Sequence, residues 1–247
     1  MSYWRWWQLP LFLLPSFNLF FSQSLNAQSI TPAADGTGTV IQHQNHTYQI
    51  EGGISSDKNL FHSFRSFGLQ PEEIAHFLTR PQIENILGRV TGGNPSLIQG
   101  LIRVTGSDAN LFLLNPAGWI FTEGASLDVP GSFAVSTANR LGFAGGFFRV
   151  LGDNDYRQLT GPPTQFIFDT EQHGSILNEA NLAVETGEDL YLVGRSVVST
   201  GTLSAPEGRI AIAAIPGQNK LEISHSESLL TLVVDATPLN GNPEITG

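Results

Sequence analysis

The sequence of 247 residues contains no cysteine, so it can form no disulfide bond, thiolate metal site or thiol nucleophile. Lysine is nearly as scarce, since Lys58 and Lys220 are its only occurrences. The 12 basic residues against 22 acidic residues give a net charge of −10, which argues against binding to nucleic-acid phosphates. Because disulfide bonds are excluded, packing and hydrogen bonds must hold the fold together.

Charge of either sign is sparse, because only 14% of the residues are charged while 40% are hydrophobic. Ordinary globular chains are about a quarter charged. This balance excludes a disordered chain, which needs few apolar and many charged residues. The 26 glycines and 14 prolines follow no period. They exclude collagen and predict short strands separated by frequent turns.

The first 27 residues differ in composition from the rest. Arg5 precedes a broken apolar run that Pro15 and Asn18 interrupt and that ends at the small residue Ala27. This pattern predicts a cleavable secretory signal peptide over residues 1–27, cut after Ala27. A single transmembrane anchor is the alternative, but it needs about 20 predominantly apolar residues without such interruptions. We expect an exported protein.

Helical patterning is confined to one short stretch. Pro71 is followed by two acidic residues and then by Ile74 and Phe77 at helical spacing, until Pro81. Proline at the first helical position and acids in the first turn are typical of a helix start. The sequence therefore predicts one short helix between residues 70 and 81.

From residue 83 onward, apolar runs of three or four residues alternate with Gly, Asn, Asp or Pro. A weak repeat of about 21 positions connects Phe112 with Phe133, Leu114 with Val135, Ile120 with Leu141, Ile176 with Val197 and Leu182 with Leu203; a step of 20 connects Leu190 with Ile210 and Leu192 with Ile212. Three short strands and three turns would close one coil of this length and stack apolar residues in its interior. The repeat favours a parallel β-helix. A β-sandwich, the alternative, would show strands every 8–12 residues without it.

Residues 143–169 interrupt the repeat. They contain Gly145-Gly146, Asp153-Asn154-Asp155 and Gly161-Pro162-Pro163. We interpret this stretch as a loop excursion from the coil, partly ordered by four phenylalanines at 147, 148, 166 and 168. The boundaries that follow are 28–236 for the β-helix and 237–247 for a flexible tail rich in Pro, Gly and Asn.

Two segments carry a family resemblance: residues 86–100, ILGRVTGGNPSLIQG, and residues 109–121, ANLFLLNPAGWIF. They closely resemble the filamentous haemagglutinin N-terminal domain, the secretion domain of two-partner secretion exoproteins. Residues 201–210, GTLSAPEGRI, are similar to the long cyanobacterial-type members. The resemblance covers about residues 30–234.

The resemblance implies an all-β fold, a single-stranded right-handed parallel β-helix (solenoid) with an N-terminal cap. It also implies a dedicated outer-membrane transporter, whose periplasmic POTRA domains and barrel pass the chain to the cell surface or extracellular space of a Gram-negative, cyanobacterial-type cell. An adhesin-like surface role follows, with host or cell-surface glycans as ligands. Neither a cofactor, nor nucleic acid, nor stable membrane insertion after signal cleavage is implied.

The family's Asn-Pro-x-Gly-Ile motif falls on Asn115, Pro116, Ala117 and Gly118, with Trp119 in place of the isoleucine and Ile120 after it. A secondary motif is spelled by Asn94, Pro95, Ser96 and Leu97. Proline fixes φ and glycine accepts positive φ, so Asn-Pro-x-Gly forces a tight corner. Two roles stay open for it: closing the coil, and contacting the transporter.

Other candidate sites are weaker. His43 and His46 could be metal ligands, but surface histidines are favoured because no third ligand is near in sequence. Asp153-Asn154-Asp155 lacks the glycine and distal glutamate of a calcium loop, so a solvated acidic turn is favoured. The sequence contains no nucleophile elbow, phosphate-binding loop or zinc-protease motif.

An enzyme is therefore not expected. The rival hypothesis is a β-helical protein that binds or cleaves polysaccharides, and cleavage would need convergent carboxylates on one groove. A freestanding extracellular matrix component is a third possibility.

Overall fold

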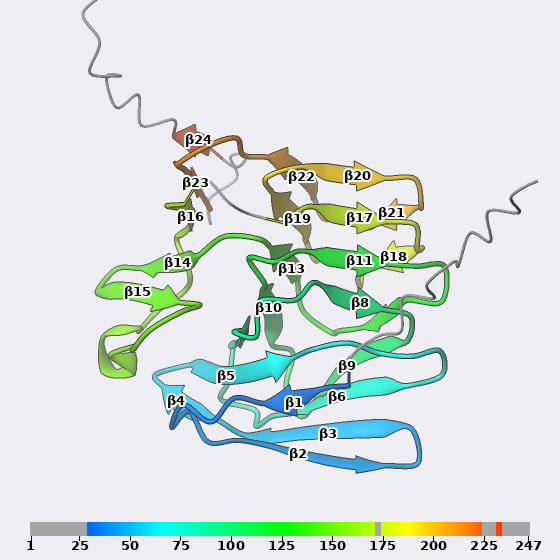
Figure 1. The fold of residues 1–247 in the computed structure, drawn as a ribbon, viewed down its shortest axis with the longest axis horizontal. Helices are drawn as coiled ribbons and strands as arrows, with labels where there is room; N and C mark the ends of the chain where they lie inside the picture. The colour runs from blue at the N-terminus through cyan, green and yellow to red at the C-terminus, as the bar shows by residue number, and fades with distance from the viewer. Residues whose placement is uncertain (1–28, 171–173, 224–230, 234–247) are drawn as a thin grey trace, which may run out of the picture.

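A computed structural model describes residues 29–170, 174–223 and 231–233. It is nearly all β, with a parallel β-solenoid of about 6 turns (Figure 1). The predicted signal peptide and the tail at 237–247 lie outside the described residues. Within the described residues, no helix has the length and apolar character to span a bilayer.

The complete coils of the solenoid contribute one strand to each of three faces. Sheet A holds β4 (Ile54–Ser56), β1 (Thr31–Pro32), β5 (Asn59–Ser66), β7 (Asn85–Val90), β10 (Asn110–Leu114), β13 (Phe133–Ser136), β19 (Leu190–Gly194) and β22 (Ile210–Ala214). Sheet C holds β8 (Ser96–Ile98), β11 (Trp119–Phe121), β17 (Ile176–Asn178) and β20 (Val197–Ser199). Sheet B holds β2 (Thr39–Gln44), β3 (Thr47–Gly52), β6 (Ile74–Leu78), β9 (Leu101–Thr105) and β12 (Ser126–Asp128), and the pair β18 (Leu182–Ala183) and β21 (Leu203–Ser204) follows.

The interior of the solenoid is a column of stacked apolar side chains. Along sheet A, parallel pairing superimposes one residue from each coil: Leu60, Ile86, Leu111, Phe133, Leu190 and Ile210. The first five are buried in the main core. Each such burial contributes about 1.5–3 kcal/mol. Ile210, on the last strand of the sheet, is 45% exposed.

The predicted repeat is wrong by one position in its first half. Phe112 pairs with Ala134, and Leu111 pairs with Phe133, so the step between β10 and β13 is 22 rather than 21. A shift of one residue moves every side chain to the other face. Phe133 accordingly points into the solenoid while Phe112 belongs to a second core outside it.

The remaining repeat pairs have mixed outcomes. Leu114 lies opposite Ser136 rather than Val135, and Ile120 lies opposite Leu177 rather than Leu141 because an inserted segment intervenes. In the later coils the predicted register is confirmed: Ile176 with Val197, Leu182 with Leu203, Leu190 with Ile210 and Leu192 with Ile212.

The predicted helix between residues 70 and 81 is wrong. Residues 74–78 form β6, which lies between β3 and β9 and buries Ala75 and Phe77 in alternation. Glu73 N donates to Gln70 O and Glu72 has φ +67°, so residues 70–73 form a β-turn with Pro71 at its second position and positive φ at its third. Pairing with two neighbouring strands outweighs the local helix signals.

The expected N-terminal cap is present. The hairpin β2–β3 closes one end of sheet B, and its two-residue turn has positive φ at Asn45 and His46, as type I′ turns require. On sheet A, β1 and β4 both pair antiparallel with β5. These strands cover the first parallel coil at the blue end of the ribbon (Figure 1).

The predicted excursion leaves the coil, but it starts at Arg140 and is a sheet rather than a loop. Sheet D is antiparallel and holds β15 (Gly146–Arg149), β14 (Arg140–Phe143), β16 (Gln165–Phe168), β23 (Asn219–Glu222) and β24 (Thr231–Val233), with a 3-10 turn η1 (Tyr156–Gln158) between β15 and β16. It stands beside the solenoid (Figure 1). Its inner face packs on the outer face of sheet A in the second core, which includes Phe61, Phe112, Phe148, Phe166 and Phe168.

Candidate functional site

The two predicted motifs lie on neighbouring coils at one corner of the solenoid. Strand β11 pairs in parallel with β8, which places Trp119 opposite Ser96 and Ile120 opposite Leu97. We call residues 94–97 and 115–120 the Asn-Pro corner. The sequence named both segments separately, and the structure brings them into contact.

Asn115 holds the corner together. Its side chain is buried, its Oδ1 accepts a hydrogen bond from Ala117 N at 3.0 Å, and its Nδ2 donates to Asn94 O at 3.0 Å and to Ser96 Oγ at 2.9 Å. Gly118 N donates to Asn115 O, which closes the turn. One amide therefore shapes its own turn and fastens it to the preceding coil.

Gly118 is fixed by the following coil. It has φ +120°, and a Cβ added there would lie 2.8 Å from Ser175 O. Trp119 N donates to Ser175 O at 3.0 Å, and Gly174 N donates to Pro116 O at 2.6 Å. The turn is thus enclosed between two coils, and glycine is the residue that fits at this position.

Trp119 is a core residue. It is fully buried, its indole Nε1 donates to Ser136 O at 3.1 Å, and its ring stacks on Phe121 and meets Phe67 edge-on. The tryptophan that replaces the motif's isoleucine therefore fills the solenoid interior, with its one polar atom satisfied.

The accessible part of the corner is uncharged. Asn94 and Pro95 are exposed, while Pro116, Ala117 and Ile120 are half-buried. Ile120 also belongs to an aliphatic ladder on the outer face of sheet C, formed by Leu97, Ile120, Leu177 and Val198 on successive strands. Exposure in this ladder rises from 8% at Leu97 to 52% at Val198. A partner would find two prolines, an amide and aliphatic side chains here.

Sequence reasoning missed a buried arginine whose ion pair and hydrogen bonds join three parts of the molecule. Arg89 on β7 donates to Asp35 Oδ2 at 2.8 Å and to Ser63 Oγ at 2.9 Å. It also donates to the carbonyls of Arg149 and Gly152 in the inserted segment. Burial raises the pKa of the Asp35 carboxyl, but hydrogen bonds from Ser63 and Thr37 and the Arg89 charge outweigh burial and lower that pKa to about 2.

It also missed an asparagine ladder on sheet A. Asn110 Nδ2 donates to Asn85 Oδ1, and Asn85 Nδ2 donates to Asn59 Oδ1. Asn59 Nδ2 in turn donates to the carbonyls of Leu159 and Gly161, which anchors the inserted segment to the coil. The sequence does contain a signal for this ladder, because an asparagine is the first residue of each of the consecutive strands β5, β7 and β10.

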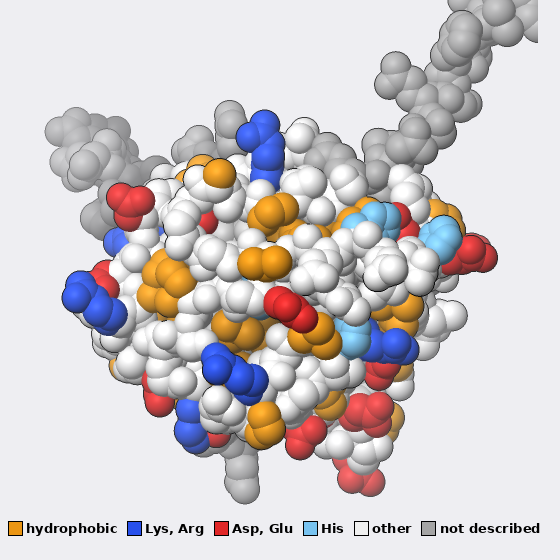
Figure 2. Space-filling view, turned by 90° about the horizontal axis from the view of Figure 1, so that it is seen from below, with side chains coloured by type: hydrophobic (Ala, Val, Ile, Leu, Met, Phe, Trp, Pro, Cys, Tyr) orange, Lys and Arg blue, Asp and Glu red, His pale blue; other side chains and the backbone are white. Residues whose placement is uncertain are grey.

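The weaker candidates lie apart from the Asn-Pro corner. His43 stacks on Tyr48 and its Nε2 is 4.0 Å from Glu73 Oε1, while His46 lies in the hairpin turn. Histidines visible at the N-terminal end gather toward one edge (Figure 2). Across residues 29–170, 174–223 and 231–233, no three His, Cys, Asp or Glu side chains gather as a metal site.

The Asp153-Asn154-Asp155 turn is held by protein groups. The Asn154 amide exchanges two hydrogen bonds with the backbone of Arg149, and Asp155 pairs with Arg157 at 3.0 Å and accepts from Gln158. Hydrogen bonds from Arg157 lower the pKa of the exposed Asp155 carboxyl.

Known proteins resemble this chain in sequence and in fold. A family model described as the TPS secretion domain matches residues 27–239. The heme/hemopexin-binding protein of Haemophilus influenzae is 48% identical over 48 residues, which is 19% of this chain and 5% of that protein. The chain therefore spans a small part of that relative.

Two solved structures share the fold. The crystal structure of the HMW1 secretion domain from Haemophilus influenzae has a TM-score of 0.57 at 19% identity, covering 85% of this chain and 49% of that chain. The crystal structure of the filamentous hemagglutinin secretion domain has a TM-score of 0.51 at 19% identity, covering 84% of this chain and 69% of that chain. With a family model that matches nearly all of its described coils, this chain belongs to the TPS secretion domain family.

Proposed function

We propose that this chain is recognised in the periplasm by a dedicated outer-membrane transporter, through the POTRA domains of that partner, and passed to the cell surface. Membership of the TPS secretion domain family supports export across the outer membrane with such a partner. At the level of residues, the proposal rests on the Asn-Pro corner, where Asn115 hydrogen-bonds to residues 94 and 96 and so joins the two Asn-Pro segments. The exposed side of that corner offers the uncharged contact surface.

Coil-by-coil folding fits this route. In a solenoid each coil contacts only its neighbours, so folding can propagate from whichever end emerges first. No disulfide can lock the chain before export, because it has no cysteine. We propose that folding outside the cell biases passage outward. A mature chain that did not fold after dilution from denaturant would contradict this.

The corner has two possible roles, and variants separate them. Asn115→Ala removes the buried amide and should lower both thermal stability and export. Asn94→Lys with Ala117→Lys changes the accessible side of the corner and leaves the amide in place. If the transporter contacts this surface, the double variant folds normally but its export falls to background.

The measurement is co-expression with a two-partner transporter, with export followed as the fraction of chain outside the cell and stability followed by thermal unfolding. Ser126→Lys with Ala183→Lys is the matched control, because both residues are exposed on other strands and the charge change is equal. Normal export of the Asn94/Ala117 variant would contradict transporter contact and leave the corner a structural element.

We further propose a non-catalytic, adhesin-like role at the surface. Five of the aspartates, Asp35, Asp128, Asp155, Asp169 and Asp189, are each paired with an arginine rather than converging on one groove. This arrangement supports binding over polysaccharide cleavage. Hydrolysis of any polysaccharide by the purified chain would contradict it.

A further inference from the structure

Sheet D has one face that packs on the solenoid and one that faces away from it. Leu141 and Phe148 point inward to the second core. Because side chains alternate along a strand, their neighbours Arg140 on β14 and Phe147 and Arg149 on β15 point outward. The outward face is the one that a ligand could reach.

Basic side chains form a row across this face. Arg149 lies directly opposite Arg140, Arg140 opposite Ile167, and Ile167 opposite Lys220. We call Arg149, Arg140 and Lys220 the basic row. It gathers three of the 12 basic residues of a chain whose net charge is −10. Among the described residues, Asp169 and Glu222 are the acidic residues beside it, so the described side chains here carry three positive and two negative charges.

The two opposed arginines of the row, Arg140 and Arg149, destabilise the sheet unless an anion binds near them. Like charges directly opposite each other on antiparallel strands destabilise a sheet. The Phe147 ring offsets part of this cost, with its centroid 5.2 Å from Arg140 Cζ and 5.9 Å from Arg149 Cζ. Asp169 Oδ2 lies 2.5 Å from Arg140 Nη2, but Arg140 Nε is buried without an acceptor. No ion pair within the described chain involves Arg149.

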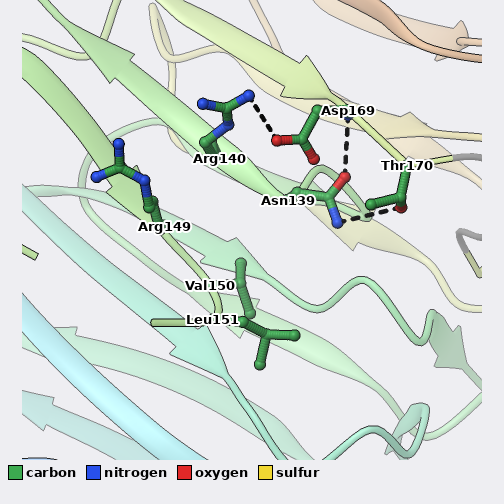
Figure 3. Close-up of a pocket in the computed structure, with 7 residues that line it drawn as sticks. All are labelled: Asn139, Arg140, Arg149, Val150, Leu151, Asp169 and Thr170. Atoms are coloured by element: carbon green, nitrogen blue, oxygen red, sulfur yellow. Dashed lines mark hydrogen bonds and ion pairs between the residues drawn. The ribbon is translucent and has the colours of Figure 1, made fainter. Parts of the chain in front are cut away.

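Two pockets meet at the Arg140–Asp169 ion pair. One has a volume of about 200 Å³ and contains Arg140, Arg149, Asn139 and Thr170 in its lining. Figure 3 shows Arg149 across this pocket from Asn139 and Thr170, with its guanidinium pointing away from the Arg140–Asp169 pair. The second, of about 350 Å³, extends along Gln165 to Lys220. The two pockets share Arg140 and Asp169, and we treat them together as one candidate groove along the basic row.

We propose that this groove binds an acidic polysaccharide, with carboxylate or sulfate groups on the basic row. Guanidinium groups donate several hydrogen bonds to such anions, and Phe147 holds two of them in place. Asn139, Thr170 and Gln165 supply the amides and hydroxyl that sugar hydroxyl groups need. An acidic peptide would supply the anionic groups but not the sugar hydroxyl groups, so it is less favoured.

This inference deepens the adhesin-like role proposed above, and its test does not involve the transporter. The purified chain is titrated with polygalacturonic acid and with dextran sulfate, with neutral dextran and poly-glutamate as comparison probes, by affinity electrophoresis at physiological salt. The two acidic polysaccharides distinguish carboxylate from sulfate. We expect binding to at least one of them, weaker binding to poly-glutamate and none to neutral dextran.

Variants locate the site. Arg140→Gln with Arg149→Gln should weaken binding about tenfold or more, since two charge-assisted contacts are lost. Arg103→Gln with Arg157→Gln makes the same charge change at exposed ion pairs elsewhere and should change binding less than twofold. Asp169→Asn removes the carboxylate that competes for Arg140 and should tighten binding, so a gain is measurable even if the double variant folds poorly.

Three outcomes would overturn the proposal. The first is absence of binding to both acidic polysaccharides. The second is an equal loss of affinity in the two double variants, which would indicate non-specific charge attraction. The third is equal affinity for poly-glutamate, which would indicate an acidic peptide as the ligand. None of these binding results bears on export of the chain, so the transporter proposal would stand.

Discussion

Arg89 and Asp35 form an ion pair of 2.8 Å between the first parallel coils and the N-terminal cap, and only 3% of Arg89 is exposed. The guanidinium also reaches two carbonyls of the inserted segment. One side chain therefore connects cap, coil and sheet D.

Arg89→Ala should destabilise the whole domain. It removes the donor to Ser63 and to two carbonyls, while Asp35, whose side chain is 26% exposed, keeps its hydrogen bonds from Ser63 and Thr37. We expect a loss of about 1.5–3 kcal/mol. Urea denaturation measures the loss in free energy of unfolding. Arg103→Ala removes the exposed pair with Asp128 and should cost less than about 1 kcal/mol. Equal losses in both variants would show that Arg89 does not hold the three parts together.

His62 should make stability depend on pH. Its imidazole is fully buried between Phe64 and Phe77, neither ring nitrogen has a hydrogen-bond partner, and burial lowers its pKa from 6.5 to about 4. The unfolded chain therefore binds the proton first as the pH falls. The free energy of unfolding should drop between pH 6.5 and pH 4, by about 3 kcal/mol in total from this group.

His62→Leu should remove this component, so the variant loses less stability than the natural chain between pH 7 and pH 4.5. Denaturation at both pH values measures the difference, and subtraction cancels the carboxylates that titrate in both proteins. His46→Asn, at the exposed hairpin turn, is the control and should keep the full pH dependence. An unchanged slope in His62→Leu would contradict the assignment.

Gly118→Ala should be more damaging than the same substitution at another glycine of positive φ that lies in open space. At Gly118 the new Cβ would meet Ser175 O at 2.8 Å, whereas at Gly187, with φ +90°, nothing lies within 4 Å. Both variants carry the cost of positive φ, about 1 kcal/mol, and only Gly118→Ala adds the clash. Thermal unfolding of the two variants compares them directly, and equal midpoints would show that the next coil does not confine the turn.

The loss in free energy of unfolding when a side chain of the interior column is truncated to alanine should depend on the position of its coil in the stack. Leu190 is buried and pairs with Ile210, which is 45% exposed on the last strand of sheet A. Leu190→Ala should cost about 2–5 kcal/mol because it leaves a cavity. Ile210→Ala should cost less than half as much. Similar losses measured by denaturation would mean that the column is equally enclosed at both positions.

The sequence predicted the solenoid from apolar residues that recur once per coil, and the later coils follow the predicted register. It misplaced Phe112 and Phe133 because a pattern of apolar residues cannot distinguish the inside of a sheet from an outer face that a second sheet covers. Phe112 packs in the second core against sheet D and does not face the interior of the solenoid. The helix expected after Pro71 failed for a related reason, because β3 and β9 impose strand pairing on residues 74–78.

The site was predicted in part. The Asn-Pro-x-Gly pattern indicates a corner from the properties of proline and glycine alone. The bond from Asn115 to Ser96 joins different coils, and no local pattern reports it. The basic row was not visible either, since Arg140, Arg149 and Lys220 become neighbours only through antiparallel pairing across sheet D.

Phe133 and Leu190 lie opposite each other although the strands β14 to β16 of sheet D come between them along the chain. A backbone that resumes its stack after so long a detour tolerates additions at its corners without loss of register. The coil framework and the sheet attached to it can therefore vary independently in sequence, because the framework needs only to keep its register.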